Sequence, residues 1–404
     1  MKALSLVVIA AANLGAATAL SAQDTTSVAP DTGYADYHES PISLPLGVGL
    51  RPPSYDRVNG LTVPWGPKLE MGDGRVDVDA LVSYRSNLGK WDPSLEGTLR
   101  PTDQNEITFF AGQGTFSNDT WIRSDLTNSL VAFFAGTDAR NYYRSTRGTA
   151  RYTLTLSGNS FTFTPFIGGN LERDWSTGGF APPKSPWSVF GRKGNLRMRR
   201  PNPGVFKGTL TSILGGTGLE LVKGGVEAKL DGTVERSLHT APTSDCGVAP
   251  IPCLVAGESF TQGTLDGRIF FPTFGSQTFT FRTHAVLTGS DGITPPQRFA
   301  YLGGTGTLAT VDLLALGGDR LLFFDGDYMI PIDKIQVPLF GSPFIALHYA
   351  AGSAGLGQLP SLIQNVGIGA GAAMLRVDYV IDPASTRSPV SRKSAVSFGI
   401  NLTL

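Results

Sequence analysis

The segment "SAVSFGINLTL", residues 394–404, decides the expected fold. Read at a period of two, it places apolar side chains on one face and small or polar side chains on the other: Phe398, Ile400, Leu402 and Leu404 against Ser397, Gly399, Asn401 and Thr403. Strands of transmembrane barrels need this arrangement, because lipid lies on one side of the sheet and water on the other. The segment therefore predicts a membrane-spanning β-strand.

The same alternation recurs in "RVDVDALVSYR" (75–85), "GVEAKLDGTVE" (225–235), "TLDGRIF" (264–270) and "MLRVDYVID" (374–382). If the apolar face of each segment meets lipid, its charged face lines the lumen. The residues predicted to face the lumen, with Asp327 from a further segment, are Asp77, Asp79, Glu227, Lys229, Asp231, Asp266, Arg268, Asp327, Arg376 and Asp378. A soluble β-sandwich also alternates, because one sheet face meets its core. It stays open as an alternative.

The connections between such segments alternate between short turns and long polar loops, as they do in outer-membrane barrels. Short turns are expected at 157–160 and 274–277, and long loops at 172–203, 239–258 and 290–319. Residues 121–143 read as a short helix, "LTNSLVAFFAG", within a loop or the lumen. At roughly 20 to 25 residues per strand and connection, residues 46–404 predict an all-β, antiparallel transmembrane barrel of about 16 strands (roughly 14–18) with long extracellular loops.

The N-terminus has the pattern of a secretory signal peptide: Lys2, an apolar run from Ala3 to about Ala12, and small residues up to Ala22. An uncleaved anchor is the alternative, but about 10 strongly apolar residues are too few for a bilayer that needs roughly 20. We expect residues 1–22 to be cleaved and residues 23–45 to form a flexible periplasmic leader. No later segment offers 18 uninterrupted apolar residues, which excludes a helical membrane protein.

The composition favours short strands and turns, with 50 Gly and 27 Pro among 404 residues. Lys plus Arg equals Asp plus Glu, 33 each, so no overall charge indicates a nucleic-acid partner. The two cysteines, Cys246 and Cys253, would reach an oxidising compartment, where a local disulfide is expected. A metal site is the weaker alternative for them, since no histidine stands nearby. The basic run 191–200 could contact lipopolysaccharide phosphates or could simply be solvated.

The sequence shows no pattern typical of catalysis, of a cofactor or of a metal site. It has no G-x-S-x-G motif, and its four histidines are scattered without a paired spacing. "GTGTLA" (304–309) matches the letters of a dinucleotide fingerprint, but no strand and helix flank it. We therefore expect a protein that is not an enzyme and that has no cofactor and no metal site.

Five pieces of the last third follow one another in a characteristic order: "TPPQRFAYLGGTGTL" (294–308), "GGDRLLFFDGDYMIPI" (317–332), "FIALHYAAGSAG", "NVGIGAGAAMLRVDYV" and "SFGINLTL" (397–404). In this order they resemble the C-terminal barrel half of the Omp85 superfamily, the bacterial surface antigen D15 type. They look like its inward-folding loop, the strand that returns from it, the following strands, and its barrel assembly signal. In that signal Ser397, Gly399, Leu402 and Leu404 fill the matching positions.

The resemblance implies an integral barrel in the outer membrane of a Gram-negative-type bacterium, in contact with the bilayer and lipopolysaccharide, with the assembly machinery as a partner during biogenesis. Two features depart from the family. The expected leader is too short for periplasmic repeat domains, and Ala309 and Thr310 stand where the family loop carries a docking arginine and glycine. We therefore expect a plugged or weakly conducting pore. A protein assembly or secretion component and a secreted soluble β-sandwich binding module are the alternatives, and no solute or client is indicated.

Overall fold

The computed structural model describes residues 42–177, 187–190, 198–242, 259–289, 294–336, 341–372, 375–384 and 390–400. All of them belong to one compact unit, Pro41–Leu404. The predicted signal peptide, nearly all of the predicted leader, both cysteines and the last four residues lie outside these ranges. Most of the basic run 191–200 also lies outside them.

Strands dominate the described residues, and 19 of them form one antiparallel sheet. They are β1 Ile42–Ser43, β2 Ser54–Asp56, β3 Gly60–Trp65, β4 Lys68–Met71, β5 Val76–Arg85, β6 Lys90–Thr102, β7 Asn105–Phe116, β8 Tyr143–Leu154, β9 Leu156–Ser157, β10 Phe161–Ser176, β11 Gly208–Lys223, β12 Val226–Pro242, β13 Thr261–Pro272, β14 Thr278–Thr288, β17 Arg320–Pro331, β18 Pro343–Gly355, β19 Ile363–Ala372, β20 Leu375–Ile381 and β21 Ser394–Ile400. The expectation of an all-β, antiparallel fold is confirmed.

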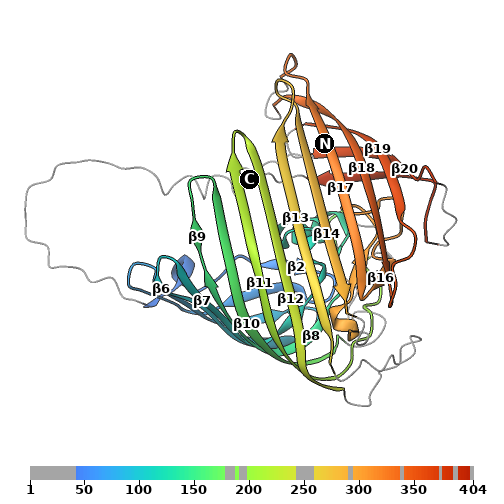
Figure 1. The fold of residues 1–404 in the computed structure, drawn as a ribbon. Helices are drawn as coiled ribbons and strands as arrows, with labels where there is room; N and C mark the ends of the chain where they lie inside the picture. Colours follow the sequence, from blue (N-terminus) through green and yellow to red (C-terminus); the bar gives the residue numbers. More distant parts are fainter. Residues whose placement is uncertain are drawn as a thin grey trace, which may run out of the picture. The chain divides into compact units, whose positions relative to one another are not determined.

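Some of the 19 strands are consecutive segments of the same row of the sheet. β3 and β4 form one row, because both pair with β5. β1 and β2 form another row, because β1 pairs with β4 and β2 pairs with β3. β8 and β9 form a third row, because both pair with β10. Joining these pieces leaves 16 rows across the sheet, in chain order, which is the predicted number. Figure 1 shows the long rows from β10 to β20 side by side in that order. Within the described residues, no ladder joins β21 to β1 or β2.

The longest connections between rows all lie at one end of the sheet, although that end also has two short connections, 57–59 and 86–89. Antiparallel rows place successive connections at alternate ends. One end carries 72–75, 103–104, 158–160, 224–225, 273–277, 332–342 and 373–374, and the other carries 57–59, 86–89, 117–142, 177–207, 243–260, 289–319, 356–362 and 382–393. The predicted starts of two long loops, at 172 and 239, are wrong. Strands β10 and β12 continue to Ser176 and Pro242, because both pair with β11 over those residues.

The register defines two faces of the sheet, because directly paired residues lie on the same face. Asp266, His284 and Phe323 are successive partners across β13, β14 and β17. We call their face the inner face, since the segment described below packs on it. The opposite, outer face carries exposed apolar side chains, including Ile167 (64% exposed) on β10 and Phe398 (75% exposed) on β21. An apolar outer face is what a membrane-spanning sheet requires.

The predicted short helix is confirmed as α2, Asp125–Ala135, within the long connection between β7 and β8. Ser124 caps its N-terminus by accepting a hydrogen bond from the Thr127 backbone N–H at 3.2 Å. Gly136, with a φ of 64°, ends the helix in the left-handed conformation that favours glycine. Among the described residues, no helix combines the length and apolarity that a bilayer span would need.

Candidate functional site: an inward-folded segment

The connection between β14 and β17 folds back over the inner face, as the family resemblance implied. We call residues 294–319 the inward segment. It contains the 3-10 helix η3 (Pro296–Arg298) and two short strands that pair with each other, β15 (Ala300–Leu302) and β16 (Leu316–Gly318). The turn after β15 needs Gly303, whose φ is 122°, because a Cβ there would collide with the carbonyl oxygen of Asp312.

Arg298 is the central docking residue of the inward segment. Its Nε donates to Glu235 on β12 at 2.8 Å, and its Nη2 donates to Glu172 on β10. Arg147 on β8 also donates to Glu172, at 2.8 Å from its Nε, and Ser212 on β11 donates to Glu235 at 2.6 Å. The side chains of Arg298 and Glu172 are 9% and 0% exposed. Two arginines thus balance two carboxylates, which is how proteins stabilise buried charge.

Neutral side chains satisfy the backbone around Arg298. Gln262 on β13 donates to the Arg298 carbonyl at 3.2 Å, and Asn118, before the helix, donates to the carbonyl of Phe299 at 3.4 Å. Asn118 also donates to the carbonyl of Gln297. A buried carbonyl without a partner would cost free energy. These bonds therefore allow an irregular backbone to lie against the sheet.

Apolar side chains of the inward segment pack on the sheet beyond Arg298. Leu302 and Leu308 are completely buried against Leu321 and Phe323 of β17, in a cluster that also includes Val286, Val311, Ala350, Ala354 and Ile363. Full burial of one leucine side chain contributes about 1.5–3 kcal/mol. The contact therefore stabilises docking independently of the charged group.

The far end of the inward segment docks through neutral polar groups. The Thr310 backbone N–H donates to Asn365 Oδ1 on β19 at 3.1 Å, and Asn365 Nδ2 donates to Thr310 Oγ1 at 2.7 Å. By the resemblance, Ala309 and Thr310 stand where the family loop carries a docking arginine and glycine. The segment docks nonetheless, because a neutral Thr–Asn pair occupies this point and Arg298 supplies a buried cation elsewhere. The same end pairs with the connection between β20 and β21, where the Asp312 N–H donates to the Val390 carbonyl at 2.9 Å.

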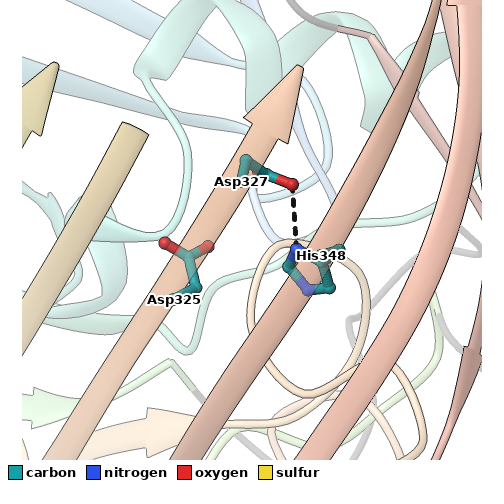
Figure 2. A group of neighbouring side chains, drawn as sticks. All are labelled: Asp325, Asp327 and His348. Carbon is teal, nitrogen blue, oxygen red and sulfur yellow. Dashed lines mark hydrogen bonds and ion pairs between the residues drawn. The ribbon is translucent and has the colours of Figure 1, made fainter. Parts of the chain in front are cut away.

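A second group of charges lies on the inner face of β14, β17, β18 and β20. Figure 2 shows Asp325 and Asp327 on β17 and His348 on β18, with His348 Nδ1 at 3.1 Å from Asp327. Arg282 on β14 donates to Asp325 through both Nε (3.0 Å) and Nη2 (2.5 Å). Arg376 on β20 donates to Asp327 at 2.7 Å and to Asp378 at 2.7 Å. The group is an ion-pair network across four strands.

This network brings three potential metal ligands together, Asp325, Asp327 and His348, whose ligand atoms lie within 4.8 Å of one another. Each carboxylate, however, already accepts hydrogen bonds from a guanidinium group, and a divalent cation would have to displace Arg282 or Arg376. Both arginines repel a cation. We therefore assign the cluster to the ion-pair network.

The register places all ten residues predicted to face the lumen on the inner face. Eight of them make ion pairs: Asp77 with Lys68, Asp79 with Arg51, Lys229 with Glu220 and Asp231, Asp266 with His284, Asp327 and Asp378 with Arg376. Glu227 and Arg268 have no ion-pair partner within the described ranges. The ten residues thus share one face of the sheet, and that this face lines a lumen stays a prediction.

The docking residues Arg298, Glu172, Gln262 and Asn365 were not predicted. Arg298 stands outside any strand, so no alternation marks it, and Glu172 was assigned to a loop. A buried arginine preceded by "TPP" carries no local signal of its partner, which lies 126 residues away.

The predicted assembly signal is described only in part. Ser397 and Gly399 lie on β21, with Ser397 buried and facing inward. Leu402 and Leu404, like the predicted pair Cys246 and Cys253, fall outside the described residues.

No family model matches the sequence, and no curated protein matches it. Solved structures, however, are similar in fold. BamA from Haemophilus ducreyi, a structure lacking POTRA domains 1–3, is 12% identical with a TM-score of 0.50, and the match covers 86% of this chain and 68% of that one. CdiB from Escherichia coli (11% identity, TM-score 0.48) and CdiB from Acinetobacter baumannii (12%, 0.46) match over 89% and 86% of this chain. The chain spans 62% and 58% of the length of these two CdiB structures.

The fold of this chain is therefore similar to that of the BamA barrel. This agrees with the resemblance found in the last third of the sequence. A single sheet of 16 rows with an apolar outer face also differs from the two packed sheets of the soluble sandwich alternative.

Proposed function

We propose that this protein is an outer-membrane β-barrel whose lumen is blocked by the inward segment, so that it is a plugged, weakly conducting pore and not an enzyme. In this proposal the inner face lines the lumen, the long connections are extracellular, and the outer face meets lipid. The bilayer and lipopolysaccharide surround it, and the assembly machinery recognises its last strand during biogenesis.

The observation that carries the proposal is the docking of the inward segment on strands that lie several rows apart in the sheet. Arg298 holds it on β10 and β12, whereas Thr310 holds it on β19. A segment fixed at both places crosses the space in front of the inner face. The mixture of paired acids and arginines on that face also favours a hydrated interior without strong ion selectivity.

Assembly or secretion is the second candidate function, as the family resemblance implies. The specific observation that favours it is the edge strand β21, which has one partner, β20, among the described residues. The end of the inward segment pairs with residues 390–392, just before this strand. An exposed strand edge can pair with a strand of another chain.

Conductance in planar bilayers tests the first proposal. We would compare the intact protein with a variant in which residues 294–316 are replaced by a short Gly/Ser linker. We expect low, weakly selective conductance for the intact protein and a large increase for the variant. A control variant, Arg100→Gln, changes an exposed ion pair with Glu106 at the opposite end of the sheet and should leave the conductance unchanged.

Two outcomes would contradict the proposal. Unchanged conductance after the replacement would show that the inward segment does not block a channel. Extraction of the intact protein from membranes by carbonate would show that it is not an integral barrel. Co-purification of a stable protein partner, present with the intact segment and lost with the replacement, would favour assembly or secretion.

A further inference from the structure

Two partly open cavities meet at one level of the inner face. One, of about 490 Å³, is lined by Lys229, Arg268, Arg282 and Gly306, and we call it the turn-side cavity. The other, of about 370 Å³, is lined by Arg147, Glu235, Gln262 and Thr264, and we call it the loop-side cavity. Three residues line both: Trp121, Asp266 and His284.

The order of lining residues along the strands separates the two cavities. On β13, Gln262 and Thr264 line the loop-side cavity and Arg268 lines the turn-side cavity, with Asp266 between them. On β14, Val286 and Arg282 lie on either side of His284 in the same way. Asp266 and His284 are direct cross-strand partners. The boundary between the cavities is therefore a single level of the sheet.

Trp121 lines both cavities at this level and covers the His284 ring. It belongs to the 3-10 helix η2 (Asp119–Trp121), and its ring stacks on His284 with centroids 4.1 Å apart and an interplanar angle of 10°. His284 Nδ1 lies 2.6 Å from Asp266 Oδ1, which fixes the imidazole. Trp121 also packs on Phe323 at 5.4 Å. The stack thus joins a connection, two strands and the inner-face apolar cluster.

The stack keeps polar atoms without hydrogen bonds. The Trp121 indole nitrogen and His284 Nε2 are buried and have no hydrogen-bond partner among the described residues. His284 as a whole is 4% exposed. A buried donor or acceptor without a partner costs free energy, so a purely structural role would favour apolar residues here. Two polar residues are therefore better explained by a role at this level of the lumen than by packing alone.

We propose that the Trp121–His284 stack, held by Asp266, is the constriction that separates the two cavities and limits the passage of small hydrated ions. This inference rests on the proposed function, since it names the narrowest level of the same blocked lumen. Lys229, Asp231 and Arg268 on one side and Arg147 and Glu235 on the other give both cavities both signs of charge.

Conductance of single variants tests the constriction with the inward segment intact. Trp121→Ala should raise the conductance several-fold, whereas Trp121→Phe, which keeps a flat ring over His284, should change it little. The matched control is Trp91→Ala, because Trp91 is an exposed tryptophan that packs on Tyr84 of the outer face. Retained heat-modifiable migration on gels shows that each variant has folded.

Thiol accessibility gives a second readout that does not depend on conductance. In a Cys246→Ser, Cys253→Ser background, cysteine would be placed at Thr264 (loop-side cavity) or at Lys229 (turn-side cavity). A small charged thiol reagent, added outside whole cells of a strain without general porins, should modify the Thr264→Cys variant readily. It should modify the Lys229→Cys variant slowly, and faster once Trp121→Ala is added.

The outcomes distinguish this inference from the proposed function. If replacing residues 294–316 raises conductance but Trp121→Ala behaves like Trp91→Ala, the constriction is refuted and the blocked lumen stands. If neither change alters conductance, the blocked lumen fails. Equal modification of the Lys229→Cys variant with and without Trp121→Ala would then also refute the stack as a barrier between the cavities.

Discussion

Replacing Arg298 with Gln should loosen the inward segment more than any other single change. The variant leaves Glu172 and Glu235 without their shared cation in a buried place. Glu172 keeps Arg147, but among the described residues Glu235 keeps only the Ser212 hydroxyl as a close donor. Removing one partner of a buried ion pair typically costs about 3–5 kcal/mol, because the other charge stays buried and unpaired. We expect the free energy of unfolding to fall by this amount, mainly because Glu235 stays buried without a cation.

A second substitution distinguishes the effect of the unpaired charge from the effect of the altered side-chain shape. Glu235→Gln removes the unpaired charge, so the double variant Arg298→Gln, Glu235→Gln should recover about 1–3 kcal/mol of the loss. Arg100→Gln is the matched control, because Arg100 and Glu106 form an exposed pair, which is worth at most about 1 kcal/mol. Unfolding in guanidinium, followed by tryptophan fluorescence in detergent, measures all four proteins. An Arg298→Gln loss no larger than that of Arg100→Gln would refute the docking role.

Further predictions concern other parts of the chain. Burial raises the pKa of Asp119, in the connection before α2, to about 7, against the opposing effects of the Asn141 N–H, Arg200 and Arg140. The folded state therefore holds a proton that the unfolded state releases, and stability should fall as pH rises from about 4 to 7; unfolding midpoints of Asp119→Asn should show a smaller fall. Mass spectrometry should find Cys246 and Cys253 bonded to each other, and two free thiols would contradict this. Changing Leu402 and Leu404 to Asp should abolish membrane insertion in fractionation, and normal insertion would argue against the assembly signal.

The sheet could be predicted from the sequence because its strands alternate with few errors. In β20, Leu375, Val377, Tyr379 and Ile381 are all exposed while Arg376 and Asp378 are covered, as the period of two required. The helix α2 was also predictable, since its apolar run lacks a period of two. The predicted strand ends were wrong where a strand continues beyond its apolar residues. Glu172 and Asp174 were assigned to a loop because they are charged, although both lie on β10.

The docking site could not be predicted for a different reason. Its residues come from β8, β10, β11, β12, β13 and β19, and no property of "PPQRF" indicates which strands will face it. Glycine in a loop predicts a turn, but it does not indicate which part of the sheet the loop will contact. The constriction was hidden in the same way, since His284 was one of four scattered histidines and Trp121 stands in a connection.

The way in which the inward segment is held has a consequence for the order of folding. Its partners lie far away in the chain on both sides: Glu172 is 126 residues before Arg298, and Asn365 is 55 residues after Thr310. Closing such long loops costs entropy before any contact rewards it, and contacts of this separation form late. The segment can reach its final position only after β10, β12 and β19 are all in place. Protection of residues 294–316 from protease would therefore report completion of the sheet, and a chain arrested before β19 should remain cleavable there.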